Sequence, residues 1–270
     1  MSRKLFLLDG SALVYRAFFA LQRMGLTNRK GEPTGAVFGF ANTLHALVKQ
    51  EQPEYLAVVF DPPGPTFRHA MYAEYKATRA KMPDELRAQL PRVRELVRAW
   101  PCAAVEAPGF EADDVIGSYA AQLAGPDLDV VAVTADKDFY QLLSPHVRIL
   151  NPGRGGAGAV DAVLLGPDDI PAKFGVTEPR QVIDVLALMG DSSDNVPGVP
   201  GIGPKTAGAL IAEYGSLEAV YEHLEDHKAG VRKKLEDHRE SAFQSRDLVT
   251  IRTDLPLPVS LDSMTAQPPG

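Results

Sequence analysis

Short apolar runs alternate with segments of helical periodicity through the first two-thirds of the chain. Four runs are almost continuously apolar, as strands of a parallel sheet covered on both faces are, and they span residues 4–8, 55–60, 129–134 and 147–150. Between them, apolar residues recur at helical spacing over 11–21, 36–49, 84–100 and 111–123, and Ser11 is expected to cap the first of these helices. This alternation predicts a doubly wound, mostly parallel α/β sheet with helices on both faces.

The pattern becomes mostly helical after residue 175. Helical spacing is found over 180–189, 205–214, 216–223 and 231–248, with no further strand. The last fifteen residues show no periodicity and are rich in proline, which favours a tail or linker. The predicted division is an α/β domain over 1–175, a helical region over 176–255 and a tail over 256–270.

Nine carboxylates stand where strands should end or helices should begin: Asp9, Asp61, Glu111, Asp113, Asp114, Asp136, Asp138, Asp191 and Asp194. An acid just past a strand points into the crevice where open α/β sheets bind ligands. Helix capping accounts for one or two acids at a helix start, but not for three within 111–114 and further pairs elsewhere. So many negative charges need a cation, and oxygen-only ligands suit Mg²⁺ or Mn²⁺. Two such ions about 4 Å apart would form a phosphodiester-cleaving centre.

Charge distribution makes an acidic chain compatible with nucleic acid. The net charge is −7, but without the nine clustered acids the rest of the chain is positive, and the stretch 68–98 is rich in arginine and lysine. No apolar run is long enough to span a membrane, so no membrane partner is expected. Cys102 is the only cysteine, which excludes a disulfide framework and fits a reducing, cytoplasmic compartment.

The basic segment 67–83 contains three aromatic residues and is only weakly periodic. A cover over an active site has this composition, and so does an ordinary solvated connection. Within it, Tyr75 can stack on an unpaired base, while Lys76 and Arg79 can neutralise a phosphate. Arg16 follows the first acid by two helical turns and can also reach phosphate, whereas Phe18 and Phe19 are expected in the core.

The run Gly198-Val-Pro-Gly-Ile-Gly-Pro-Lys-Thr206 has the small residues of a helix–hairpin–helix turn. Glycines bring backbone N–H groups close to a phosphate, and the following helix adds its positive N-terminus. The alternative is a plain helix–turn–helix junction. The residues expected to bind DNA here are Gly198, Gly201, Ile202, Gly203, Lys205 and Thr206.

Several strings together resemble the bacterial 5′-nuclease family, the flap-endonuclease-like 5′→3′ exonuclease domain of DNA polymerase I. They are LLDGSALVYRAF, FDPPGPTFRH, YKATR, GFEADDVIG, TADKDFYQL and MGDSSDNVPGVPGIGPKTA. The resemblance implies a PIN/Rossmann-like fold with a helical arch at about 67–98. It implies that one ion is surrounded by Asp9, Asp61, Glu111 and Asp113, and the second by Asp136, Asp138 and Asp194, with Glu111 or Asp113 shared between them. Asp114 and Asp191 would act from outside the ligand shell, Arg68 and Arg16 would lie near the phosphate path, and the hairpin would hold K⁺.

The function expected from these residues is structure-specific 5′→3′ exonuclease and 5′-flap endonuclease activity in replication and repair. One ion would activate a water for attack on phosphorus, the other would stabilise the leaving oxygen, and Lys76 and Arg79 would add positive charge. The substrate would be DNA with a 5′ flap, a nick or a recessed 5′ end, RNA-primed ends included. The chain is expected to act as a monomer with a linked or separate DNA polymerase. A non-catalytic flap-binding module and a PIN-like ribonuclease remain alternatives.

Overall fold

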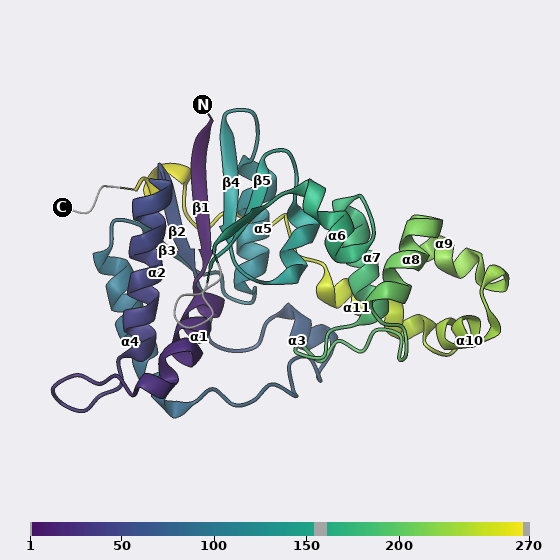
Figure 1. Ribbon diagram of the computed structural model, residues 1–270, viewed down its shortest axis with the longest axis horizontal. Coiled ribbons are helices and arrows are strands. Elements are labelled where there is room, and N and C mark those ends of the chain that lie inside the picture. The colour runs from purple at the N-terminus through teal and green to yellow at the C-terminus, as the bar shows by residue number, and fades with distance from the viewer. Residues whose placement is uncertain (1, 154–160, 267–270) are drawn as a thin grey trace.

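Six strands form one sheet in the computed structural model, which describes residues 2–153 and 161–266. The order is β3-β2-β1-β4-β5-β6, and every neighbouring pair is parallel except β5 and β6 (Figure 1). The strands are β1 (Arg3–Asp9), β2 (Tyr55–Val59), β3 (Ala103–Val105), β4 (Leu128–Val133), β5 (Val147–Asn151) and β6 (Val163–Leu165). The predicted fold class, a mostly parallel α/β sheet, is confirmed.

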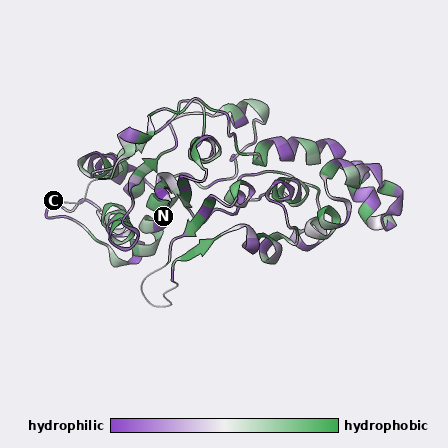
Figure 2. Ribbon diagram, turned by 90° about the horizontal axis from the view of Figure 1, so that it is seen from above, coloured by the Kyte–Doolittle hydropathy of each residue, from purple (hydrophilic) through white to green (hydrophobic). Residues whose placement is uncertain are grey.

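Helices cover both faces of the sheet because successive strand residues point to opposite sides. Phe6 and Leu8 of β1 pack with α1 (Gly10–Leu21), α2 (Gly35–Glu51) and α4 (Asp84–Ala99). Leu5 and Leu7 face the other layer, to which α5 (Ala112–Leu123) contributes. Seen from above, hydrophobic colour follows the strands between the helices (Figure 2).

The C-terminal part of the chain extends the molecule away from the sheet as a group of helices (Figure 1). They are α6 (Ile170–Phe174), α7 (Pro179–Met189), α8 (Pro204–Tyr214), α9 (Leu217–Glu222), α10 (Ala229–Asp237) and α11 (Arg239–Val249). The single helix expected over 231–248 was wrong, because His238 leaves the helical conformation and separates α10 from α11. The buried residues of α7, α8 and α11 join the same core cluster as those of α5, so the two parts share one core.

Residues 256–266 are not the free tail that their composition suggested. Met264 is fully buried in a short 3₁₀ turn, Leu261–Met264, and the backbone N–H of Ala266 donates to Glu54 at 2.9 Å. The Tyr119 hydroxyl also bonds to the carbonyl of Val259 at 2.9 Å. A few apolar residues without regular spacing are enough to hold this segment along the sheet edge, so a periodicity search misses them. The expected tail residues 267–270 lie outside the described part.

The strand order changes direction next to β1, where β2 lies on one side and β4 on the other. In parallel sheets such a switch point opens a crevice at the carboxyl ends of the strands. One connection, from β2 to α4, crosses this edge, and it consists of α3 (Phe67–Met71) and the stretch 72–83 (Figure 1). The expected arch over 67–98 therefore has helices at both ends, whereas 72–83 contains turns and no α-helix. None of the helices in the described residues is long and apolar enough to cross a membrane.

Candidate active site

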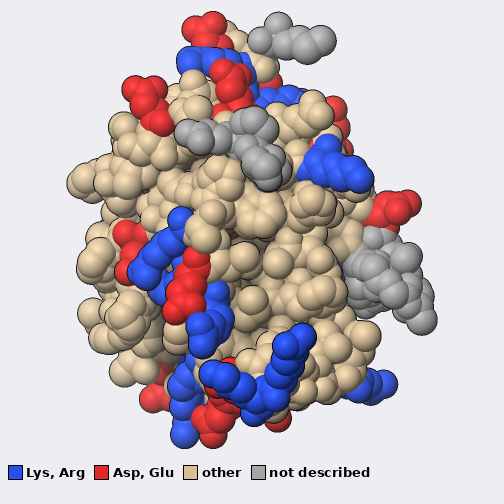
Figure 3. All heavy atoms as spheres, turned by 90° about the vertical axis from the view of Figure 1, so that its left-hand side faces the viewer, with Lys and Arg blue, Asp and Glu red and all other residues tan. Residues whose placement is uncertain are grey.

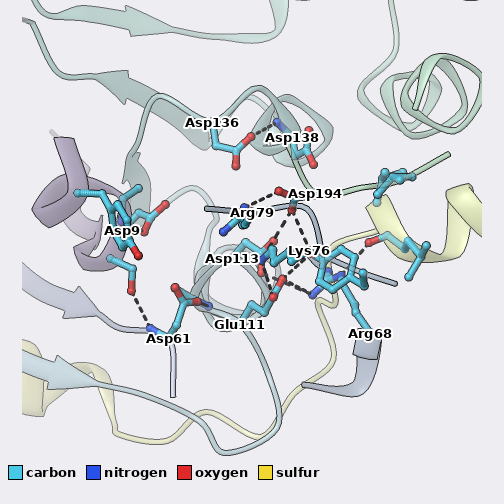
Figure 4. A pocket seen from close by; sticks show the side chains of 18 of the residues that line it. Asp9, Asp61, Arg68, Lys76, Arg79, Glu111, Asp113, Asp136, Asp138 and Asp194 are labelled. Atoms are coloured by element: carbon cyan, nitrogen blue, oxygen red, sulfur yellow. Dashed lines mark hydrogen bonds and ion pairs between the residues drawn. The ribbon is translucent and has the colours of Figure 1, made fainter. Parts of the chain in front are cut away.

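A cavity of about 660 Å³ opens at the carboxyl ends of β1, β2 and β4. Seven of the nine predicted acids line it: Asp9, Asp61, Glu111, Asp113, Asp136, Asp138 and Asp194. Figure 4 shows these side chains converging from separate elements, with Lys76 and Arg79 among them. The structure thus brings together acids that are up to 185 positions apart in the chain.

Asp9 ends β1 and is held in place by its own backbone turn. One carboxylate oxygen accepts the N–H of Ala12 at 3.0 Å, and the other accepts the hydroxyl of Thr134 at 3.2 Å. Asp9, rather than Ser11, is therefore the cap of α1, and the capping prediction was wrong. Burial, with the nearby charges of Asp61 and Asp136, raises the pKa of Asp9 to about 7.

Ser11 instead connects two acid-bearing loops. Its hydroxyl accepts the backbone N–H of Asp61 at 3.0 Å, directly after β2. The Asp61 carboxylate in turn accepts the N–H of Ala112 at 2.8 Å, at the first residue of α5. These bonds fix the loop after β2 against the start of α5, where Glu111 and Asp113 stand.

Glu111 and Asp194 lie close together, and basic side chains of the 72–83 connection pair with them. The Lys76 ammonium lies 2.5 Å from Glu111 and 3.7 Å from Asp194, while Arg79 pairs with Asp194. The Tyr75 hydroxyl lies 2.9 Å from Glu111 and 3.1 Å from Asp194. Burial alone would lower the pKa of Lys76, but Glu111 and Asp194 outweigh it and raise the pKa above its ordinary value. Lys76 is therefore charged, and it neutralises carboxylates that line the cavity.

The stacking role expected of Tyr75 does not fit its position. The side chain is 4% exposed, with its hydroxyl between the two acids and its ring against His69. Burial and the neighbouring carboxylates Glu111 and Asp194 raise the pKa of Tyr75. A ring so enclosed cannot offer a face to a base, and Tyr75 acts here as a hydrogen-bond donor that orients the two acids.

Asp136 and Asp138 follow β4 on a short 3₁₀ helix, Lys137–Leu142. Asp136 caps this helix by accepting the N–H of Asp138 at 3.0 Å. One buried oxygen of Asp138, Oδ1, has no hydrogen-bond partner among the described residues, and the Lys137 ammonium lies 3.3 Å from it as an ion-pair partner. Burial and then the charge of Asp136 raise the pKa of Asp138 to about 7.

Lys137 is a site residue that the sequence argument missed. Its ammonium pairs with Asp191 and lies beside Asp138. The other oxygen of Asp191 accepts the N–H of Ser193 at 2.7 Å and of Asp194 at 3.3 Å. Asp191 therefore shapes the turn that carries Asp194 and takes no part in the cavity lining formed by described residues. The position of Lys137 between two predicted ligands, in TADKDF, was the available signal.

Arg68 and Asp114 form a buried ion pair, which contradicts the phosphate contact expected of Arg68 and is compatible with the place outside the ligand shell expected of Asp114. Arg68 is 1% exposed, and its guanidinium donates to Asp114 at 2.7 and 2.9 Å and to Glu111 at 3.2 Å. It also donates to the carbonyls of Leu248 and Thr250 at 2.7 and 3.1 Å. Because the N–H groups of the Arg68 guanidinium are already hydrogen-bonded inside the protein, Arg68 cannot also bind a phosphate. Asp114 is fully buried and cannot reach an ion in the cavity.

Asp113 lies beside this pair and completes the acid group. Its pKa is raised well above the ordinary value by burial and by the charges of Asp114 and Glu111, against the opposing effect of Arg68. As the side chains stand, no three acids, histidines or cysteines of the described residues form a group that could hold a metal ion. Lys76, Arg79 and Lys137 instead supply the positive charge.

The outer wall of the cavity is aromatic and basic. Tyr15 and Phe19 line it, and Phe19 is 54% exposed, so only Phe18, at 3%, fulfils the expectation of a core residue. Arg16 donates to the carbonyl of Gly153 at 2.6 Å and makes a further contact, but it is absent from the cavity lining of the described residues. On the face over α2 and α4, lysine and arginine gather in the lower part, with acids among them (Figure 3).

The hairpin 198–206 divides into a buried and an exposed half. Gly198 is buried with its N–H bonded to Ser245 at 2.9 Å, and Ile202 is 3% exposed, so neither can bind DNA as expected. The expected residues that are exposed, at the start of α8, are Gly201, Gly203, Lys205 and Thr206. The carbonyl of Gly201 accepts the ammonium of Lys234 at 2.9 Å, so a side-chain cation already stands where K⁺ was expected.

Comparison with known proteins covers the whole chain. A family model described as the 5′-3′ exonuclease N-terminal resolvase-like domain matches residues 4–175, and one described as the 5′-3′ exonuclease C-terminal SAM fold matches residues 177–270. The DNA polymerase I of Caldicellulosiruptor bescii is 44% identical over 261 residues, which are 97% of this chain and 30% of that protein. The DNA polymerase I of Deinococcus radiodurans is 47% identical over 258 residues, which are 94% of this chain and 26% of that protein. The chain thus spans less than a third of either relative.

One solved structure shows the same fold with ligands bound. The D15 flap endonuclease of bacteriophage T5, in a complex with DNA and metal ions, superposes with a TM-score of 0.72 at 23% identity. The match covers 93% of this chain and 90% of that one. At this identity the similarity establishes the fold.

Proposed function

Since the chain belongs to the 5′-3′ exonuclease family, we propose that it cuts DNA phosphodiester bonds at 5′ flaps, nicks and recessed 5′ ends with the help of two divalent ions. The observation that carries this proposal is the convergence of seven carboxylates and the cations Lys76 and Arg79 on one cavity. Acidic ligands for ions beside basic groups for phosphate are the parts that phosphodiester hydrolysis needs.

The acids suit divalent ions for three reasons. The donor set consists of carboxylate oxygens, which Mg²⁺ and Mn²⁺ prefer. The pKa values of Asp9 and Asp138 are raised to about 7 by burial and by neighbouring carboxylates, so a bound cation would stabilise their charged forms. The buried Oδ1 of Asp138 has no hydrogen-bond partner among the described residues. We assign one ion to Asp9, Asp61, Glu111 and Asp113, and the second to Asp136, Asp138 and Asp194.

When bound, such ions supply an activated water and stabilise the leaving oxygen. The chain's own residues do the rest. Lys76 and Arg79 pair with Glu111 and Asp194, which would hold the ions, so both cations lie where they would neutralise the charge of a phosphate bound there. Hydrogen bonds from Thr134 and from the backbone of Ala12 keep the Asp9 carboxylate oriented. Each carboxylate oxygen keeps a further lone pair, so both oxygens are still able to bind an ion.

Duplex binding belongs to the exposed half of the hairpin. Gly201 and Gly203 bring the backbone to the surface, and the N-terminus of α8 adds Lys205 and Thr206, an arrangement that suits a phosphate. K⁺ at this hairpin is part of the proposal, and it would share the Gly201 carbonyl with Lys234, since a carbonyl has two lone pairs. The proposal includes action as a monomer in the cytoplasm together with a DNA polymerase, linked or separate.

The test is cleavage of a fluorescent 5′-flap DNA under single-turnover conditions. Wild type should cut with Mg²⁺ and stop with EDTA, and Asp138→Asn should bind the flap in Ca²⁺ but lose at least about a hundredfold in rate, as expected on losing an ion ligand. Asp168→Asn, an acid remote from the cavity lining, is the matched control. Binding without cleavage by wild type would indicate the non-catalytic module, and preference for matched RNA would indicate the ribonuclease. Either result would overturn the proposal.

A further inference from the structure

Two residues with rare backbone conformations face each other at the cavity. Lys76 has φ of 58° and Asn195 has φ of 56°, both in the left-handed region. Asparagine adopts this region several times more often than most residues, whereas a long side chain such as lysine adopts it at a cost in strain. Such strain persists only where neighbouring contacts hold the backbone, so the contacts around Lys76 decide where its ammonium lies.

Two reciprocal hydrogen bonds join the turns that carry these residues. The backbone N–H of Lys76 donates to the carbonyl of Asp194 at 2.8 Å. In the opposite direction, the side-chain amide of Asn195 donates to the carbonyl of Glu74 at 2.6 Å. The bonds lie on either side of Tyr75, whose hydroxyl lies between Glu111 and Asp194. Together these two hydrogen bonds fix the position and orientation of the 74–76 turn relative to Glu111 and Asp194.

The turn that carries Asn195 is itself rigid. Asp191 and Val196 exchange backbone hydrogen bonds of 2.9 and 2.7 Å across its base. The Asp191 carboxylate also accepts the N–H and the hydroxyl of Ser193 inside the turn. The strained Lys76 turn is therefore held against a stable support, and the Asn195 side chain supplies a hydrogen bond from that support to the Glu74 carbonyl.

We propose that Asn195 is a positioning residue that holds the Lys76 ammonium over Glu111 and Asp194, an inference that rests on the nuclease function proposed above. Asn195 does not touch the phosphate. Its amide sets the conformation of the 74–76 backbone, and that conformation directs the Lys76 side chain into the cavity. If Asn195 were only a turn former, glycine, which adopts positive φ without cost, would replace it fully.

The experiment compares Asn195→Gly in two backgrounds. In the wild-type background the variant keeps its turn and loses the amide, so kcat on the 5′-flap substrate should fall about tenfold, the effect of about one hydrogen bond. KM and DNA affinity in Ca²⁺ should stay within about twofold. In a Lys76→Met background the same change should alter kcat by less than about twofold, because the residue it positions is gone. Gln52→Gly, a change to glycine at the left-handed residue that follows α2, is the matched control.

A second measurement does not depend on cleavage. In the ion-free protein, Lys76 is mostly buried beside Glu111, so amine-reactive labelling at this residue, followed by mass spectrometry, should be slow. Asn195→Gly and Asn195→Asp, which keeps the shape but cannot donate, should both speed labelling several-fold. Unchanged labelling and kcat, or an equal loss of kcat with and without Lys76, would overturn the inference. If wild type labels as expected but cuts no flap, the proposed function fails while the positioning contact stands.

Discussion

Replacing Arg68 by methionine removes the centre of a buried network. The change leaves Asp114, which is fully buried, and the inner oxygen of Glu111 without their cation, and it frees the carbonyls of Leu248 and Thr250. Breaking a buried ion pair from one side costs about 3–5 kcal/mol. At roughly 2–4 °C per kcal/mol for a chain of this size, the midpoint of thermal unfolding should fall by roughly 6–20 °C.

Thermal unfolding followed by circular dichroism, and DNA affinity measured in Ca²⁺ well below the lowered midpoint, separate the two roles considered for Arg68. A structural arginine gives a large drop in midpoint with affinity changed less than about threefold. In the double variant Arg68→Met with Asp114→Leu, part of the loss should return, because no unpaired charge remains at position 114. Unchanged stability with a large loss of affinity would refute the buried-pair reasoning and restore the phosphate contact.

Three further predictions follow from the cavity and the hairpin. Burial raises the pKa of Asp9 and Asp138 to about 7, above the ordinary carboxyl value near 4, so the stability they contribute is complete below about pH 4 and is lost as the pH rises through about 7. Mg²⁺ should therefore raise the unfolding midpoint more at pH 8 than at pH 5.5 in differential scanning fluorimetry; an equal rise would contradict this. Lys205→Ala should weaken duplex binding evenly across sequences and lower the salt slope by about one, with Lys173→Ala as control, and an unchanged slope in anisotropy titrations would remove Lys205 from the interface. Thr134→Val should lower kcat several-fold by freeing one Asp9 oxygen, with Thr43→Val as control, and full activity would mean that Asp9 is oriented without this bond.

The fold was predictable because its signals are local and repeated. Continuous apolar runs such as 4–8 and 55–60 are what a doubly covered strand requires, and β1 and β2 lie there. The misses occurred where tertiary contacts override the local pattern. His238 interrupts a periodic stretch, and Met264 is buried by a segment without any period. The enzyme class was also predictable, since the family models identify the chain as a member of the 5′-3′ exonuclease family.

The sequence indicated which acids lie in the site better than it indicated what each charged residue contacts there. Clustered acids at strand ends must converge in a parallel sheet, which located the cavity. Whether a charged residue contacts an ion, DNA or a buried partner depends on tertiary packing, which the spacing of residues along the sequence does not reveal. Arg68 was expected near the phosphate path and Asp114 just outside the ligand shell, yet the two neutralise each other inside the protein. Tyr75 likewise resembles a stacking residue until the positions of Glu111 and Asp194 around its hydroxyl are known.

The ions themselves give the most direct test of the central claim. Anomalous diffraction from crystals soaked in Mn²⁺ should show two peaks in the cavity. One should be bounded by Asp9, Asp61, Glu111 and Asp113, and the other by Asp136, Asp138 and Asp194, with Lys76 and Arg79 withdrawn from the acids they pair with in the ion-free chain. A cavity without Mn²⁺ peaks, or peaks at Asp114 and Asp191 instead, would contradict the account.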